Sequence, residues 1–145
     1  MEATGSTAAT TRTGQDLHRG RILVADDDAD LRRLVTWTLR KEGYEVVEAA
    51  DGMEFIDCLE ATAWNPACRP FDAIVSDVKM PGLSGLDLLA LFRCTVLTTP
   101  IILMTAFADA ETRSEAEALG ATALLDKPLD LATLRAAVAR ALPPS

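Results

Sequence analysis

Five polar side chains stand at the ends of short apolar runs in this chain of 145 residues. Asp26 and Asp27 follow the first run, Asp77 the third, Thr105 the fourth, and Lys127 comes just after the fifth. If the runs are parallel strands of one sheet, their carboxyl ends meet at one edge, where open α/β sheets bind their ligands. The sequence therefore predicts carboxylates, a hydroxyl and an ammonium at a common edge.

The three carboxylates predict a cation at that edge. Two carboxylates at ~4 Å repel each other by about 4 kcal/mol at an effective dielectric constant of ~20, and a single lysine cannot offset three such pairs. Oxygen ligands without His or Cys suit Mg²⁺. With Lys127 and Thr105 opposite, the edge can hold a phosphoryl group, and Asp77 is placed as the nucleophile that would form an aspartyl phosphate.

A structural interpretation competes with this one, because a polar residue also marks the point where a strand leaves the core. It is the better interpretation for Asp28, which is placed to cap a helix. It also suffices for Thr105 alone or for Lys127 alone. It does not explain Asp26 and Asp27 together with Asp77, since capping needs only one acid at the start of a helix.

The elements that must position these residues alternate along the chain. Apolar runs with β-branched residues predict strands over 22–25, 44–49, 71–76, 101–104 and 123–125. Helical spacing predicts helices ahead of Gly43, over 55–59, from Ser84, over 109–120 and from Asp130. Strand then helix, five times, predicts a doubly wound α/β fold with a five-stranded parallel sheet, in which the alternating second strand lies at an edge.

Composition excludes several classes of protein. The 14 Lys and Arg against 22 Asp and Glu give a net charge of −8, so nucleic acid and anionic membranes are disfavoured as direct partners. With 49% hydrophobic residues, disorder of the whole chain is excluded. The three cysteines lack C-x-x-C spacing, which indicates reduced thiols, and no signal peptide or membrane span is expected. We therefore expect a cytoplasmic protein.

One domain is expected over residues 21–142. Residues 1–20 are mainly small and polar and predict a disordered leader, which holds the single histidine, His18. Without a second His or a Cys nearby, that residue cannot anchor a metal site or a catalytic triad. Residues 143–145 are expected to be either a tail or the start of a linker.

Over residues 21–142 the chain resembles the response-regulator receiver domains of two-component signalling. The resemblance rests on four motifs in order, each at a strand end: Ile22–Asp27, Asp77–Pro81 with Gly85, Thr105–Ala106 and Lys127–Pro128. Each motif alone is weak, and the four together are specific. The resemblance implies the flavodoxin-like strand order 2-1-3-4-5.

The resemblance also implies a role for each motif residue. Asp77 would accept the phosphoryl group from a phosphohistidine on a sensor histidine kinase or a histidine phosphotransfer protein. The implied Mg²⁺ ligands are Asp27, Asp77 and the backbone carbonyl of Lys79, with Asp26 acting through a water. The implied phosphoryl-binding residues are Thr105, Ala106, Lys79 and Lys127. The Lys127–Pro128 bond would be cis.

The sequence departs from the family pattern in two places, at a switch position and in the connection before the third predicted strand. The position where such receivers usually carry a switching Tyr or Phe holds Leu124, so Thr105, Leu124 and Phe107 are the candidate switch residues. The face formed by 109–120, 123–125 and 130–142 would report phosphorylation to an output domain or protein, with a phosphorylation-dependent homodimer as one form. The connection over 61–70 is longer than usual and is expected to be an inert surface loop, with a contact to a partner as the alternative interpretation.

Three functions follow from these residues. The first is a phosphorylation-activated switch that catalyses only its own phosphorylation and dephosphorylation, and so is not an enzyme acting on other substrates. The second is a haloacid-dehalogenase-like phosphatase, which would need an Asp two residues after the nucleophile, where this chain has Lys79. The third is an interaction module that has lost phosphorylation, for which Leu124 is the supporting feature.

Overall fold

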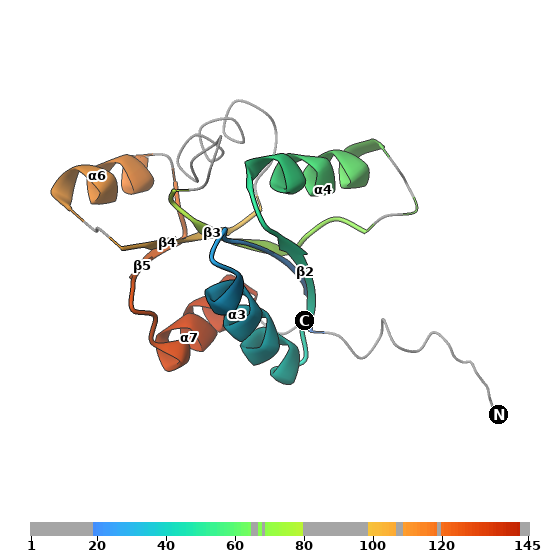
Figure 1. The fold of residues 1–145 in the computed structure, drawn as a ribbon, viewed down its shortest axis with the longest axis horizontal. Helices are drawn as coiled ribbons and strands as arrows, with labels where there is room; N and C mark the ends of the chain where they lie inside the picture. The colour runs from blue at the N-terminus through green and yellow to red at the C-terminus, as the bar shows by residue number, and fades with distance from the viewer. Residues whose placement is uncertain are drawn as a thin grey trace.

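The computed structural model describes residues 19–64, 67, 69–79, 99–106, 109–118 and 120–142. Strands and helices alternate through these ranges (Figure 1). The elements are β1 (Arg21–Ala25), α3 (Ala29–Lys41), β2 (Glu45–Ala49), α4 (Gly52–Trp64), β3 (Ala73–Asp77), β4 (Ile101–Thr105), α6 (Ala110–Ala118), β5 (Ala123–Asp126) and α7 (Leu131–Ala141). The helix predicted from Ser84 lies outside the described residues, as do most of the predicted leader and residues 143–145.

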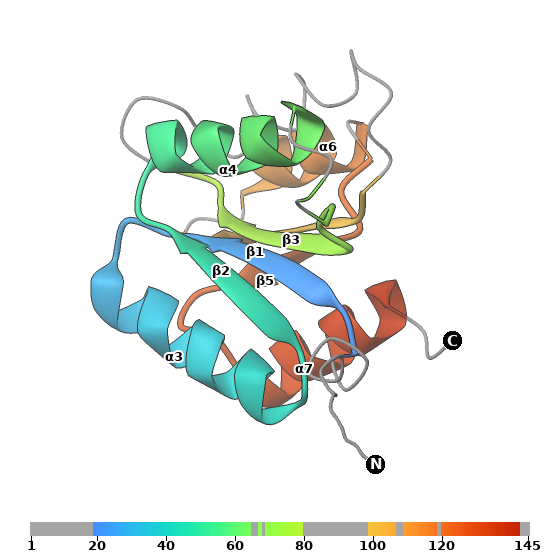
Figure 2. The same ribbon diagram turned by 90° about the vertical axis from the view of Figure 1, so that its right-hand side faces the viewer.

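The five strands form one parallel sheet in the order β2-β1-β3-β4-β5. This order confirms the predicted fold and places β2 at an edge. Helices α3 and α7 cover one face of the sheet, and α4 and α6 cover the other (Figures 1 and 2). The register pairs Asp77 with Met104 and Thr105 with Asp126, so the carboxyl ends of adjacent strands lie level.

Side chains of the central strands supply a core on each face of the sheet. Along β1, Ile22 and Val24 pack into the cluster under α3 and α7, while Leu23 packs with Phe55 of α4 on the other face. Strands β3 and β4 are buried along their whole length. Each fully buried aliphatic side chain stabilises the fold by about 1.5–3 kcal/mol. This burial stabilises the strand ends at the carboxyl edge, from which the site loops start.

Helix caps keep the loops at the carboxyl edge short. The Asp28 side chain accepts hydrogen bonds from the backbone N–H groups of Asp30 and Leu31 at the start of α3. Asp130 caps α7 in the same way. Gly43, with φ of 98°, follows α3, as the sequence predicts, because this left-handed conformation favours glycine.

The connection after α4 differs from the prediction. Helix α4 continues to Trp64, so the first part of the expected loop over 61–70 is helical. Arg69 forms an ion pair with Glu45 of β2, and its backbone carbonyl accepts a hydrogen bond from Arg21. The prediction of a loop is therefore wrong for residues 61–64, which are helical, while the prediction that the segment is functionally inert stays a prediction.

Residues 19 and 20, at the end of the predicted leader, contact the start of β2. The Arg19 N–H donates to the Gly43 carbonyl at 2.9 Å, and the Glu45 N–H donates to the Gly20 carbonyl at 2.9 Å. The Arg19 guanidinium also lies over the Tyr44 ring. In the described part of the chain, no helix has the length and apolar character needed to cross a membrane.

Candidate functional site

Asp26 is buried at the end of β1 and all its polar groups are engaged by the protein. Its N–H donates to the Ala49 carbonyl of β2 at 3.1 Å. One carboxylate oxygen, Oδ1, accepts from the Asp28 N–H at 2.9 Å, and the other, Oδ2, accepts from Lys127 Nζ at 3.2 Å. Its exposed fraction is 0%, so this carboxylate is held in one orientation.

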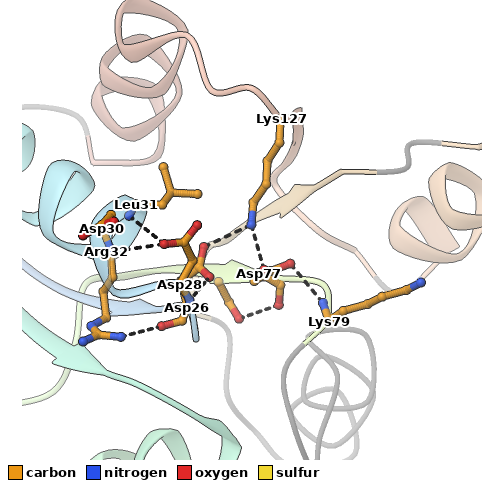
Figure 3. Close-up of polar contacts among 9 residues, drawn as sticks. Asp26, Asp28, Asp30, Leu31, Arg32, Asp77, Lys79 and Lys127 are labelled. Atoms are coloured by element: carbon orange, nitrogen blue, oxygen red, sulfur yellow. Dashed lines mark hydrogen bonds and ion pairs between the residues drawn. The ribbon is translucent and has the colours of Figure 1, made fainter.

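Asp77 is the last residue of β3 and shares the same lysine. Its Oδ2 accepts from Lys127 Nζ at 2.8 Å, and its Oδ1 accepts from the Lys79 N–H at 3.0 Å (Figure 3). The Lys127 N–H in turn donates to the Thr105 carbonyl at 2.8 Å, and the Lys127–Pro128 peptide bond is cis, as predicted. The lysine thus bridges the ends of two adjacent central strands.

Asp27 completes an acidic cluster. One oxygen from each of Asp26, Asp27 and Asp77 lies within 4.8 Å of the others, although Asp27 is exposed and the other two are buried. In the part of the chain that the structure describes, Lys127 is the cation bonded to these carboxylates. Three negative charges against one positive charge leave the cluster with the excess that the sequence predicts.

Burial and charge raise the pKa values of both Asp26 and Lys127, whereas an ion pair ordinarily lowers the pKa of its carboxylate. Burial raises the pKa of the Asp26 carboxyl, and the Asp28 N–H and Lys127 oppose this only in part. Burial would lower the pKa of Lys127, but the hydrogen bond and charge of Asp77, helped by Asp26, raise it above the ordinary value. The raised pKa keeps Lys127 in its cationic form, whereas burial disfavours the ionised form of Asp26.

The chemistry of the donor set fits Mg²⁺. The cluster offers carboxylate oxygens, and no His or Cys belongs to it. Mg²⁺ prefers oxygen ligands and usually takes only one or two carboxylates, keeping the rest of its shell for water and phosphate. The exposed Asp27 is the carboxylate best placed to receive an ion from solvent, since Asp26 and Asp77 already accept hydrogen bonds on both oxygens.

A cavity of about 110 Å³ opens beside the cluster. Its lining residues are Asp77, Lys79, Thr105, Ala106 and Lys127. Since a cavity needs a volume of roughly 10–15 Å³ to hold one water molecule, this cavity has room for a group of several atoms. The structure therefore brings the predicted acceptor, hydroxyl, amide and ammonium residues to the wall of one small cavity.

The remaining predicted residues lie apart from this cavity or outside the described chain. The Lys79 ammonium extends away from Asp77, so it is the backbone of Lys79 that faces the acceptor (Figure 3). Leu124 is partly buried and lines a separate cavity of about 240 Å³ between α6 and β5, beside Arg113. Phe107, the third candidate switch residue, lies outside the described residues.

Sequence analysis missed Arg32, whose guanidinium lies against the loop that carries the acidic pair. Its Nη1 donates to the Asp26 carbonyl at 2.8 Å, and its Nε donates to Glu48 of β2 at 3.0 Å. The two partners come from different elements, so no local spacing in the sequence indicates the contact.

Known proteins share this chain's sequence and structure. Residues 22–139 match the family model of the response regulator receiver domain. Sporulation initiation phosphotransferase F of Bacillus subtilis is 32% identical over 123 residues, which make up 85% of this chain and 94% of that protein. Transcriptional regulatory protein FixJ of Bradyrhizobium diazoefficiens is 35% identical over 124 residues, which make up 86% of this chain and 57% of FixJ. This chain thus spans little more than half of that relative's length.

A solved structure has a similar fold. Chemotaxis protein CheY4 of Vibrio cholerae has a TM-score of 0.72 and 35% identity, and the match covers 85% of this chain and 98% of that one. The sheet order, the acidic cluster and the bridging lysine all lie within the matched region. The chain therefore belongs to the response regulator receiver domain family of two-component signalling.

Proposed function

We propose that this receiver domain is a phosphorylation-activated switch in which Asp77 accepts a phosphoryl group from a phosphohistidine. The donor would be a sensor histidine kinase or a histidine phosphotransfer protein. The observation that carries the proposal is the position of Asp77, which lines the cavity. Its Oδ2 lies 2.8 Å from Lys127 Nζ, and the carboxylates of Asp26 and Asp27 lie beside it.

In the proposed transfer, one carboxylate oxygen of Asp77 forms a bond to phosphorus while the phosphorus–nitrogen bond of the phosphohistidine breaks. The imidazole nitrogen of the donor keeps the electron pair of that bond. The Lys127 ammonium, which bonds to Asp77 beforehand, would then pair with a phosphoryl oxygen. Thr105 and Ala106 both line the cavity, and the Thr105 hydroxyl and the Ala106 N–H would donate to the other oxygens.

Mg²⁺ is the proposed cofactor. Asp27, Asp77 and the backbone carbonyl of Lys79 would hold it, with Asp26 acting through a water. When bound, the ion would offset the negative charge that builds up between the carboxylates and the phosphoryl oxygens. Asp26 is buried and bonded to Lys127, which supports an indirect role for this residue.

We place the output at the surface formed by α6, β5 and α7. Lys127 follows β5 directly, and its N–H is bonded to Thr105, so movement at the phosphoryl group would reach β5 through the backbone. An Arg113–Asp126 ion pair links α6 to the end of β5. With Leu124 at the usual aromatic position, this surface would change without the usual rotation of an aromatic ring.

The proposed reaction is restricted to the chain's own aspartate. Lys79 stands two residues after Asp77, where a phosphatase of the aspartyl-nucleophile class needs a second Asp as general acid and base, and its ammonium extends away from the acceptor (Figure 3). Steady release of phosphate from small phosphoesters would contradict this restriction.

The test is incubation with acetyl phosphate and Mg²⁺, followed by mass spectrometry of the intact chain and of its peptides. The wild type is expected to gain one phosphoryl group on the peptide that contains Asp77, and Asp77→Asn is expected to gain none. Asp72→Asn is the matched control, because Asp72 directly precedes β3 at the opposite end of that strand from Asp77. A wild type that stays unmodified, or modification of Asp77→Asn at the wild-type level, would overturn the proposal.

A further inference from the structure

Arg32 joins three parts of the molecule near the acidic cluster. It lies in the first turn of α3, and its side chain is only 14% exposed. Its Nη1 donates to the backbone carbonyl of Asp26 at 2.8 Å (Figure 3). Its Nε donates to Glu48 of β2 at 3.0 Å. The guanidinium thus ties the helix and the edge strand to the loop after β1.

The Asp26 carbonyl belongs to the peptide unit that leads to Asp27. A peptide unit is planar, so the direction of this carbonyl fixes the direction in which the Cα of Asp27 lies. On the other side, the Asp26 N–H is bonded to the Ala49 carbonyl of β2. Both ends of Asp26 are therefore clamped, and the clamp constrains the backbone from which the exposed carboxylate of Asp27 extends.

We propose that Arg32 is a positioning residue that holds Asp27 in the arrangement needed to bind a divalent cation, with Glu48 orienting the guanidinium. The inference rests on the proposed Mg²⁺-dependent function. It concerns the placement of the ligand and not the charge of the arginine, because Arg32 bonds to a backbone carbonyl and not to any of the three carboxylates.

The direction in which Mg²⁺ affinity changes distinguishes a positioning role of Arg32 from an effect of its charge. A guanidinium near the cluster repels an incoming cation, so removal of its charge alone would tighten cation binding. Loss of the clamp would instead let the loop move and weaken binding. Partners that orient metal ligands typically change metal affinity by about 10–100-fold when they are removed.

Arg21, the first residue of β1, is a matched control for Arg32. Its Nε donates to Glu45 of β2 at 3.2 Å, and its Nη1 donates to the Arg69 carbonyl, so it repeats the contacts of Arg32. It is similarly shielded, with 17% of its side chain exposed. It lies at the opposite end of β1, about 16 Å from Asp26 for five residues at ~3.3 Å each. Its loss removes an equivalent ion pair without touching the acidic cluster.

The experiment is calorimetric titration of the full chain with MgCl₂, with the amide NMR signal of Asp27 as a second readout. Arg32→Met is expected to weaken Mg²⁺ binding about tenfold and to shift or broaden the Asp27 signal before any metal is added. Arg21→Met is expected to bind Mg²⁺ like the wild type while it lowers the melting temperature. Arg32→Lys keeps the charge but cannot make both contacts, so it is expected to resemble Arg32→Met.

Each outcome decides the inference. If Arg32→Met and Arg32→Lys bind Mg²⁺ as tightly as the wild type, or more tightly, the positioning role is overturned while the proposed function stands. If the wild type itself binds no Mg²⁺, the proposed function fails and the positioning role fails with it. If the Arg32 variants do not fold, Glu48→Gln replaces them: it keeps the arginine with a weaker partner, and an affinity unchanged from wild type contradicts the inference.

Discussion

The charged clusters at the two ends of the parallel sheet differ in their balance of positive and negative residues. At the amino end, Arg21 and Arg69 share the carboxylate of Glu45, and the Arg21 N–H donates to Asp72. Two cations there meet two anions. The Arg21 guanidinium also lies over the ring of Phe71, 4.5 Å from its centre, so its apolar surface is covered as well.

At the carboxyl end the charges do not balance. Asp26, Asp27 and Asp77 face Lys127, and burial raises the pKa of Asp26 despite the lysine. A balanced network stabilises the fold and needs no further partner. An unbalanced one keeps an affinity for a cation and for groups that a cation can bridge, which supports our proposal that this end of the sheet is the functional one.

Lys127→Met gives the largest expected effect at the carboxyl end. It leaves two buried carboxylates without their cation, and loss of one partner of a buried pair costs about 3 kcal/mol of the free energy of unfolding. Urea denaturation without Mg²⁺ measures this loss, and Mg²⁺ is expected to restore part of it. Lys41→Met, at an exposed lysine of α3, is the control; equal losses in the two variants would refute the comparison.

Asp26→Asn is expected to raise the melting temperature and to weaken Mg²⁺ binding. The raised pKa of Asp26 means that the folded state binds a proton more readily than the unfolded state. The stability of the metal-free wild type therefore falls as the pH rises through that pKa, and it recovers when the group is protonated. The variant lacks this step, so its advantage in thermal unfolding should appear above the pKa and disappear in acid. An advantage that persists unchanged into acid would contradict this account.

Glu45→Gln tests the amino end. The carboxylate is partly exposed and bonded to two arginines, so its loss is expected to lower the free energy of unfolding by about 1 kcal/mol. Mg²⁺ affinity and phosphorylation should stay at the wild-type level. A changed Mg²⁺ affinity in this variant would show that the two ends of the sheet are coupled.

The smallest change in the free energy of unfolding is expected at alkaline pH, where Lys127 loses its proton. Because the folded-state pKa of Lys127 is raised, its contribution to stability is complete below the ordinary lysine value of about 10.4 and is lost as the pH rises through the folded value. Unfolding of wild type and Lys127→Met in urea, from about pH 9 upward, measures the difference between them. Parallel curves for the two proteins would rule out this contribution.

The sequence predicts the fold and the site for the same physical reason. Strand ends are places where apolar residues give way to polar ones, so Asp26, Asp77 and Thr105 are visible as residues that end apolar runs. Helix caps such as Asp28 and Asp130 are visible because their preference is local. The parallel sheet then brings residues that are far apart in the chain to one edge.

Contacts between elements are not visible in this way. Arg32 and Glu48 lie sixteen positions apart in the sequence, and they meet only because α3 packs beside β2. Arg69 reaches Glu45 across the sheet from a segment whose Asn and Pro residues indicate a loop. Such pairs depend on the distance between packed elements, which no periodicity in the chain reports.

The order of the strands has a consequence for how the domain behaves in concentrated solution. A sheet with β2 and β5 at its borders presents unpaired backbone groups there, and such borders invite other chains to add strands. Here β2 carries Glu45 and Glu48, and β5 is only four residues long and ends at Asp126. Short borders and borders lined with charged side chains oppose strand addition, so the same sheet that gathers charge at its carboxyl end is also protected from growing into aggregates.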